Sequence, residues 1–459
     1  MWKKEGSFHS RSLGPGVQLF VHPTTKFKTT TLKVYSHHRL DDRASHNALM
    51  AFVLRQGTSG HPDAVSISRA LEDLYGATLE LDVFKLGERQ ILSAHLEILN
   101  DHFAKDRTLF DRGLSLVRDL LFDPLVEGRG FSRRFFEQER HNLIRLIESL
   151  TNEKGLYAAE RLIEEMCADE PYGIHELGSI DRLQEIENDE LFDYHRSRMG
   201  CCPVDVYVVG DIDRDRIADR ILEALPDGAD REELSTLPKT VHRRPRRARR
   251  IVEEADIQQA RLAIGYRTPT DSASTLGLLY CDAILGGGSA SKLFRHLRED
   301  AGLAYYAHSG LDRLKGILSV HVGVDSEKLD QAHSIVQRQL SALRRGDVTE
   351  HELESARESF LHRARSLEDH PVAMIRSTLV ARAIGRPLSA RESIARHRQA
   401  SVEHIAEAAA LIRPDTSFFL RRHDSQTTPD ELVEQPSAKK GAGERPVAAS
   451  ASGGVPCAS

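Results

Sequence analysis

The sequence lacks the features that would place it in a disulfide-bonded, membrane or nucleic-acid-binding class. Its 459 residues include five cysteines, an odd number, and no CxxC or Cys/His cluster, so a disulfide framework is not expected. No run of 18 apolar residues occurs, and the polar N-terminus has no apolar core of a signal peptide. The net charge is −6, whereas nucleic-acid binders are more often basic. We therefore expect a cytoplasmic protein without a membrane or nucleic acid as partner.

Two long segments show the same order of predicted elements. The first has strands at 17–22, 29–35, 77–84, 90–98 and 204–209, and helices at 44–55, 64–75, 109–121 and 131–150. The second has strands at 260–266, 304–311, 316–324 and 417–421, and helices at 275–285, 291–299, 327–343 and 350–384. A repeat of this length indicates duplication of a domain rather than a solenoid. The predicted fold is α+β, with two homologous domains that each pack helices on a mostly antiparallel sheet.

Composition sets the predicted domain limits. We place the N-terminal domain at 1–228, a basic linker at 229–250, the C-terminal domain at 251–424 and a tail at 425–459. The linker carries Lys239 and a run of arginines up to 250, which is typical of a solvated segment. The alternative, a patch for nucleic acid or an acidic partner, is less favoured because no aromatic residue interrupts the run. The tail has too few apolar residues to order itself, so we expect disorder there.

Zinc-peptidase motifs are absent throughout the chain. An HExxH or HxxEH motif places two histidines and one glutamate on one helix face. The nearest candidates are His175-Glu176, His351-Glu352 and the segment from His404 to Glu407, and each lacks the second histidine. One imidazole and one carboxylate rarely hold catalytic zinc, which takes three protein ligands.

Residues 286–305 carry the most specific pattern in the sequence. Three glycines are followed by Ser-Ala-Ser-Lys-Leu-Phe, and then, from 297, by Leu-Arg-Glu-Asp-Ala-Gly-Leu-Ala-Tyr. This stretch resembles the GGG-x-x-S-x-L-F … LRE-x-x-GL-x-Y signature of the pitrilysin/insulinase metallopeptidases. The tandem α+β plan over residues 15–422 is similar to that of a half-length member of the family.

The resemblance also locates the zinc site that this chain lacks. Active members carry HxxEH directly before a Gly-Thr pair, and a glutamate on a later helix is the third ligand. Alignment on Gly57-Thr58 puts Ala48, Ala51 and Phe52 at the three HxxEH positions, and the second pattern puts Leu146 at the third ligand. None of these side chains binds zinc or transfers a proton. The resemblance therefore implies no catalytic residue, metal ligand or cofactor in this chain.

Arg298 and Tyr305 match the arginine and tyrosine that hold substrate in the family. In this chain the zinc beside that substrate would have to come from another subunit. Arg298 and Tyr305 would then complete the partner's site through charge stabilisation and hydrogen bonding. The alternative is that Arg298 pairs locally with Glu299 or Asp300 and serves the fold alone.

The glycine run of Gly286, Gly287 and Gly288 is expected to bind substrate as well. In the family this turn lines the chamber beside an extended peptide, where the backbone approaches closely. A phosphate cradle at the following helix is disfavoured, because no Lys-Ser/Thr follows in P-loop spacing.

One rival metal site remains open from the residues alone. Glu137 and His141 stand four apart on a predicted helix, and Glu148 lies seven further along. His37 and His38 could approach from the end of a strand. Such scattered polar residues are more often a solvated helix face.

These observations leave three functional hypotheses. Residues 152–173 resemble the inactive YmfF-type branch of the family, which is associated with 5-aminopentanol modification of EF-P. The first hypothesis is a non-catalytic protein that pairs with an HxxEH-bearing sister subunit and helps enclose an extended peptide, bound as an added strand. The second is a zinc-dependent metalloendopeptidase with displaced ligands. The third is a non-peptidase structural subunit of a modification pathway.

Overall fold

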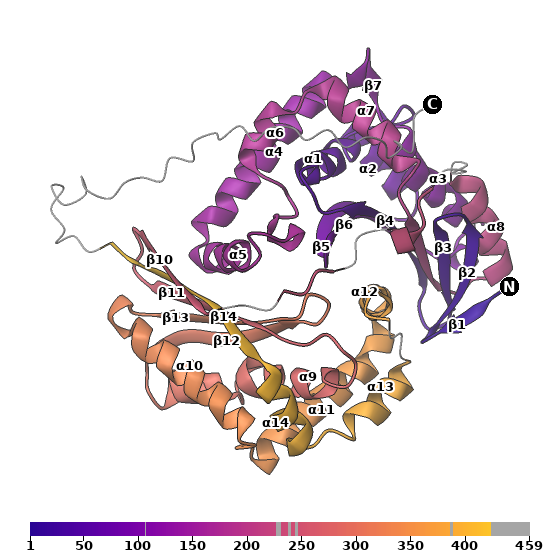
Figure 1. The fold of residues 1–459 in the computed structure, drawn as a ribbon. Helices are drawn as coiled ribbons and strands as arrows, with labels where there is room; N and C mark the ends of the chain where they lie inside the picture. The colour runs from indigo at the N-terminus through magenta and orange to yellow at the C-terminus, as the bar shows by residue number, and fades with distance from the viewer. Residues whose placement is uncertain (106, 226–230, 237–239, 244–246, 386–388, 424–459) are drawn as a thin grey trace, which may run out of the picture.

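The computed structural model contains two large β-sheets with helices on their outer sides (Figure 1). It describes residues 1–105, 107–225, 231–236, 240–243, 247–385 and 389–423. The tail predicted at 425–459 lies outside these residues. All strands of the first sheet come from residues up to 210, and all strands of the second begin at or after Arg249. The predicted α+β class is confirmed, while the domain limits at 228 and 251 stay predictions.

Seven described strands form the first sheet. Their order across the sheet is β1-β2-β3-β9-β4-β6-β5, and only β3 and β9 are parallel. The strands are β1 (Lys3–Glu5), β2 (Phe8–Gly14), β3 (Val17–Pro23), β4 (Thr29–Arg39), β5 (Thr78–Leu86), β6 (Arg89–Leu99) and β9 (Val204–Gly210). A separate short hairpin pairs β7 (Val126–Glu127) with β8 (Gly130–Phe131).

The second sheet repeats the pattern of the first. Its order is β10-β14-β11-β13-β12, and only β10 and β14 are parallel. The strands are β10 (Arg249–Ala255), β11 (Ala260–Arg267), β12 (Ala304–Asp312), β13 (Ile317–Val324) and β14 (Arg413–Arg422). This order corresponds strand for strand to β3-β9-β4-β6-β5. The shared topology supports the duplication that the order of predicted elements indicated.

Helices also follow the same order in the two units. The first unit has α1 (Ala44–Leu54), α2 (Ala64–Glu72), η1 (Asp101–Phe103), α3 (Leu109–Phe122), α4 (Arg133–Asn152), α5 (Lys154–Met166), η2 (Pro171–Gly173), α6 (Ile180–Glu185), α7 (Asn188–Met199) and α8 (Arg214–Ala224). The rest are η3 (Leu234–Thr236), α9 (Thr275–Gly286), η4 (Phe294–Glu299), η5 (Ser326–Lys328), α10 (Leu329–Arg344), α11 (Glu350–Ser366), η6 (Leu367–Asp369), α12 (Pro371–Ala383), α13 (Ala390–His397) and α14 (Val402–Leu411). Among the described residues, no helix has the length and apolar character needed to cross a membrane.

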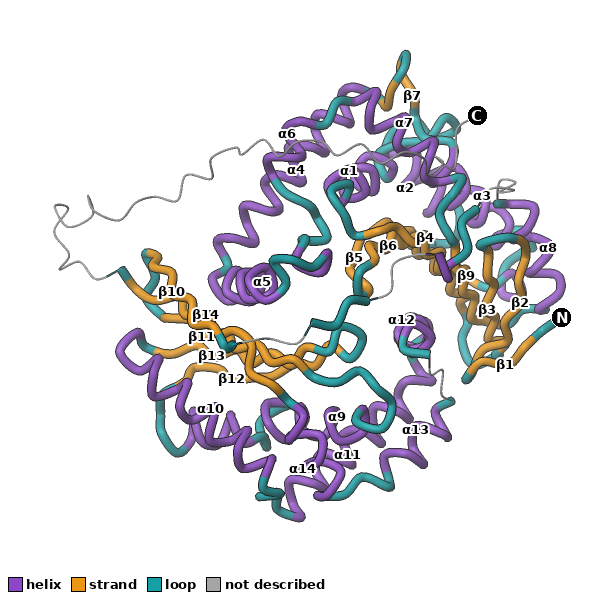
Figure 2. The backbone as a smooth tube through the Cα atoms, in the orientation of Figure 1, coloured by secondary structure: helices purple, strands orange, loops and turns teal. Residues whose placement is uncertain are grey.

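Each unit contributes one helix to the inner face of the other unit's sheet. Figure 2 shows α5 and α12 lying between the two sheets. On α5, Leu162 and Met166 pack against Phe418 and Leu420 of β14 in the second sheet. On α12, side chains such as Ile375 pack against the first sheet in return. Helix α5 follows α4 in the first unit, and α12 follows α11 in the second. The two exchanged helices therefore occupy corresponding positions in the duplicated units.

Strand β9 illustrates the consequence of this double covering. All seven of its residues are buried. Val206 and Val208 point into the core under the outer helices, whereas Tyr207 and Val209 belong to the core under α12. A strand covered on both faces needs a nearly continuous apolar sequence, which VDVYVVG supplies.

A buried ion network joins the two units. Lys315, in the turn between β12 and β13, is fully buried, and its Nζ lies 2.6 Å from the Glu170 carboxylate and also contacts Glu88. Arg267 binds the same Glu170 at 2.6 Å and Asp415 at 2.9 Å. Burial alone would raise the pKa of Glu170, but the hydrogen bonds from Lys315 and Arg267 outweigh it and hold that pKa below its usual value. Carboxylates of the first unit, Glu88 and Glu170, thus meet buried cations of the second.

Three predictions about this architecture need correction. The helix predicted at 350–384 is divided: α11 ends at Ser366, η6 follows, and α12 begins at Pro371, since proline is tolerated at the first position of a helix but not in its interior. The linker is not solvated throughout, since Arg231 is buried and donates to the carbonyls of Met199 and Cys202 at 3.0 Å. Strand β10 occupies the end of the predicted linker, from Arg249.

The Lys315→Met variant tests the ion network. It removes a buried cation while leaving two buried carboxylates, so we expect the free energy of unfolding to fall by about 3–5 kcal/mol. Urea denaturation would measure the change. Adding Glu88→Gln to Lys315→Met should recover part of the loss, whereas Lys328→Ala, at an exposed ion pair, should leave the unfolding midpoint unchanged. Equal midpoints for wild type and Lys315→Met would contradict this account.

Stability should also fall in mild acid because of buried histidines. Burial lowers the pKa of His38 to about 3. In the unfolded chain the same imidazole would be protonated below about pH 6.5, whereas in the folded protein it stays neutral until the pH is much lower. This contribution is present above pH 6.5 and is lost as the pH falls toward 3, at about 1.4 kcal/mol per pH unit. Chemical unfolding between pH 7.5 and 4.5 should therefore show a shallower pH slope for His38→Gln. The exposed His362→Gln should keep the wild-type slope, and identical slopes for all three proteins would refute the prediction.

Candidate functional site

Helix α1 stands where the zinc-binding helix of an active relative is expected. Ala48 and Ala51 are 0% and 1% exposed, and they belong to the apolar core beneath the first sheet's outer helices. Polar residues of α1 are used in packing as well: Asn47 donates to Gln90 at 2.7 Å and accepts from Tyr194 at 3.1 Å. The helix therefore presents core side chains at positions where an active site would present ligands.

The third HxxEH position is covered by a cation. Phe52 is partly buried, and the Arg55 guanidinium lies 4.1 Å from its ring centroid. Arg55 also reaches Glu139 of α4, with 3.3 Å between Nη2 and Oε2. Glu139 is almost fully buried and accepts a further hydrogen bond from Asn142 at 2.9 Å. The Glu139 carboxylate is thus already held by protein groups.

The position of the third zinc ligand carries no donor atom. Leu146 lies on α4 with 37% of its side chain exposed. In the described part of the chain, no group of three or more His, Cys, Asp or Glu side chains could hold a metal ion. The set proposed from sequence as a rival metal site therefore does not come together as ligands: Glu137, His141, Glu148, His37 and His38.

The two adjacent histidines have other partners. His37 lies with its Nε2 3.3 Å from the Asp205 carboxylate, which also binds Arg382 of α12 at 2.7 Å. His38 lies with its Nδ1 3.4 Å from the sulfur of Cys202. Burial lowers the pKa of both imidazoles, so they are neutral near pH 7. They serve the packing of β4 against its neighbours.

In the second unit, two of the three motif glycines are required by packing. A Cβ on Gly286 would lie 2.3 Å from the Ser309 backbone nitrogen, and one on Gly287 would lie 2.7 Å from Ala283 Cα. At Gly288 a Cβ would meet nothing within 4 Å. Gly287 and Gly288 line a cavity of about 410 Å³ between α9 and α11. Their assignment to a peptide stays a prediction, with Gly288 the glycine whose surroundings leave room for one.

The first two cations of the motif are bound inside the unit. Lys292 lies 3.0 Å from Glu352 of α11, and Arg295 pairs with the same carboxylate. Glu352 is also the third residue of a capping box with Thr349. Sequence reasoning treated Glu352 only as half of a failed zinc motif, although the Thr-x-x-Glu pattern before an apolar run was a signal for its capping role.

Arg298 differs from those two cations. It is exposed at the end of η4, and its guanidinium lies 5.0 Å from the Phe294 ring centroid. No ion pair of Arg298 exists among the described residues, and Asp300, its expected local partner, lies 2.8 Å from His296 instead. The local pairing that was the alternative for Arg298 is therefore not observed with Asp300.

Tyr305 lies on the neighbouring strand, since η4 packs against β12. The register between β12 and β13 shifts at Tyr305, which produces a bulge at this residue. Its side chain is 53% exposed, and the hydroxyl donates to Asp325 at 3.1 Å. The structure thus brings the two predicted substrate residues onto adjacent elements.

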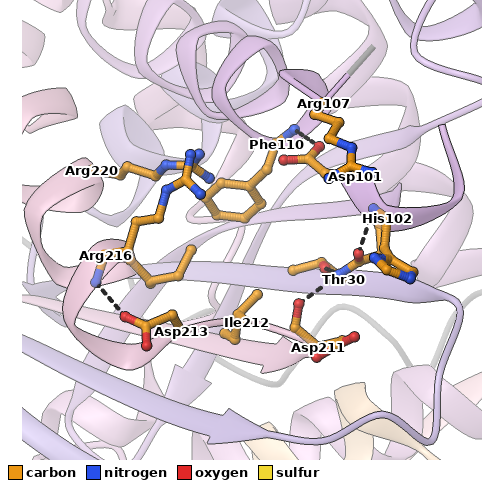
Figure 3. A pocket seen from close by; sticks show the side chains of 12 residues that line it. Thr30, Asp101, His102, Arg107, Phe110, Asp211, Ile212, Asp213, Arg216 and Arg220 are labelled. Atoms are coloured by element: carbon orange, nitrogen blue, oxygen red, sulfur yellow. Dashed lines mark hydrogen bonds between the residues drawn. The ribbon is translucent and has the colours of Figure 1, made fainter. Parts of the chain in front are cut away.

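A further pocket lies where β4 begins and β9 ends (Figure 3). It was not predicted from the sequence. It measures about 370 Å³ and is lined by three arginines and three aspartates together with apolar groups. Arg220 lies 3.0 Å from Asp111, and Asp213 caps α8 by accepting from the Arg216 backbone nitrogen at 2.9 Å. Because its charges balance and several serve the fold, we assign no activity to it.

Comparison with known proteins agrees with this geometry. A family profile described as the peptidase M16 inactive domain matches residues 185–360. The probable inactive metalloprotease YmfF of Bacillus subtilis (strain 168) is 31% identical over 411 residues, which cover 88% of this chain and 96% of the relative. The chain belongs to the M16 peptidase family.

Two solved structures show the same fold. A conserved protein from Enterococcus faecalis V583 has a TM-score of 0.84 and 26% identity, covering 91% of this chain and 99% of that chain. A peptidase M16 inactive domain from Pseudomonas fluorescens has a TM-score of 0.75 and 17% identity, covering 92% and 100%. With alanine, alanine, phenylalanine and leucine at the four zinc-site positions, this chain is an inactive M16 protein.

Zinc should have no effect on the purified chain. The three ligand positions, Ala48, Phe52 and Leu146, offer no donor atom and Glu139 is held by Arg55, so we expect a zinc content far below one ion per chain after tag removal and gel filtration. Thermal unfolding after EDTA treatment should give the same Tm with and without added Zn²⁺. One tightly held zinc per chain, with chelator-sensitive peptide cleavage, would contradict the assignment and favour displaced ligands.

Proposed function

We propose that this M16 protein is the non-catalytic member of a pair, in which a sister chain with an intact HxxEH motif supplies the zinc. The pair would enclose an extended peptide between the two chains. We place it in the cytoplasm, the compartment that the cysteine usage of the sequence favours.

The observation that carries the proposal is the state of Arg298. Three cations follow the glycine turn, and two of them, Lys292 and Arg295, form ion pairs with Glu352. Arg298 keeps its guanidinium exposed beside Phe294, with no ion pair in the described residues. A guanidinium without a carboxylate partner is available to stabilise charge that develops on a bound peptide during cleavage.

The neighbouring strand offers a place for the peptide backbone. β12 pairs with β13 on one side, and no described strand pairs with its other edge. An extended peptide can add to such an edge through main-chain hydrogen bonds. Tyr305, at the bulge of this strand, would donate or accept a hydrogen bond beside the added peptide.

The two chains of the proposed pair would have different chemical roles. The sister chain would activate water at zinc and move the proton. This chain would hold the substrate and neutralise charge through Arg298 and Tyr305. Glu139 would take no part in the chemistry, because it is buried and bound to Arg55.

The proposal is tested by assembling the pair. This chain should co-purify with an HxxEH-bearing half-length M16 chain, and the complex should cleave unfolded peptides. Arg298→Ala should lower kcat about 10²-fold with the complex intact, because one charge-stabilising group is lost. Tyr305→Phe should have a smaller effect, and the exposed Arg338→Ala on α10 should leave cleavage unchanged.

Two outcomes would contradict the proposal. Failure of this chain to bind any HxxEH-bearing sister would remove the pairing itself. Full activity of the Arg298→Ala complex would instead indicate a structural subunit that binds no peptide. Gel filtration and peptide cleavage, measured on the same samples, separate these two results.

A further inference from the structure

A cavity at the junction of the two units has an unusual charge. It measures about 600 Å³ and receives arginines from three different segments. Arg89 comes from the start of β6, Arg313 from the turn after β12, and Arg382 from the end of α12. No aspartate or glutamate occurs among its described lining residues, which contrasts with the balanced pocket of Figure 3.

One of these three cations is neutralised by the protein. Arg382 lies 2.7 Å from the carboxylate of Asp205 and 3.2 Å from that of Glu5, and its guanidinium stacks 4.0 Å above the Phe20 ring centroid. This arginine therefore forms one wall of the cavity without requiring a further partner.

The other two cations have no carboxylate partner among the described residues. Arg89 hydrogen-bonds the imidazole of His37, at 3.4 Å, and it is also attracted electrostatically to the Asp205 carboxylate, which is itself bound by Arg382 at 2.7 Å. Burial lowers the pKa of the His37 imidazole, so it is neutral near pH 7. For Arg313 the structure shows neither a hydrogen bond nor an ion pair within the described residues. Burial lowers the pKa of both guanidinium groups by more than the neighbouring carboxylates raise it, Asp205 for Arg89 and Asp312 for Arg313.

The acidic side chains that precede these two arginines in the sequence are bound elsewhere. Glu88, next to Arg89, binds the buried Lys315 and accepts from the Val241 backbone nitrogen at 3.2 Å. Asp312, next to Arg313, accepts from the Tyr172 hydroxyl at 2.7 Å and from the backbone nitrogen of Lys315 at 2.8 Å. Neither carboxylate can turn to the cavity without breaking these bonds.

We propose that this cavity binds a small organic anion that carries carboxylate or phosphate groups. Two guanidinium groups on opposite units, neither ion-paired with a carboxylate of the described residues, suit bidentate contacts with such groups. The hydroxyls of Thr240 and Thr270, which also line the cavity, add neutral hydrogen-bonding groups. The volume lies in the range of small-molecule sites, about 300–1,000 Å³. Since Arg89 belongs to the first unit and Arg313 to the second, the ligand bridges them.

Binding should therefore stabilise the folded chain, and thermal unfolding measures it. Citrate and inorganic phosphate are the probes, and chloride at matched ionic strength is the control. We expect at least one probe to raise the Tm of the full chain in a saturable manner. Arg313→Gln and Arg89→Gln should each weaken the response about tenfold, whereas the exposed Arg338→Gln should keep it. A larger response to citrate assigns a carboxylate ligand, and a larger response to phosphate assigns a phosphate ligand.

The variants without ligand provide a second readout. Arg313→Gln removes a half-buried charge without a partner, so its Tm in chloride should equal or exceed that of the wild type. A purely structural role for Arg313 predicts a lower Tm instead. The proposal is overturned if neither anion acts differently from chloride, or if wild type, Arg313→Gln and Arg89→Gln respond alike. Neither result bears on the pairing with a sister chain.

Discussion

The ammonium group of Lys315 is the point on which the arrangement of the two units depends. It lies on the second unit and is fully buried, and it is bound by Glu88 and Glu170 of the first. A buried charge is tolerated only when its partners are in place, so any shift of one sheet relative to the other would leave uncompensated charges without water. Arg267, which bridges Glu170 and Asp415, extends the same constraint to β14. The network thus specifies one docking geometry.

The packing around α1 shows how the fold is kept without zinc-binding residues. The residues at the first two lost positions, Ala48 and Ala51, are small core residues, so α1 still packs on its sheet. The salt bridge between Arg55 and Glu139 gives the buried carboxylate of α4 a partner at the end of α1. The second unit keeps its glycine turn and its exposed Arg298, because packing of η4 against β12 does not depend on zinc.

Sequence patterns predicted the parts of this structure that rest on local periodicity. Alternating apolar residues marked the hairpin of β5 and β6, and the repeated order of elements indicated the duplication. The ion network could not be predicted, because Glu88 and Lys315 are 227 positions apart and neither has a local pattern. The break at Pro371 did have a local signal and was missed. The sequence also could not separate Arg298 from Arg295, since only the fold brings Glu352 to one of them.

The helices α5 and α12, each lying on the other unit's sheet, bear on the history of this chain. Once a duplicated gene product had come to share helices in this way, either half alone would expose an apolar sheet face, including Phe20 and Tyr207 in the first unit or Phe418 in the second. Selection against aggregation would then oppose any return to two separate genes. The two units can therefore differ in chemistry, but each depends on the other's helix to cover its sheet.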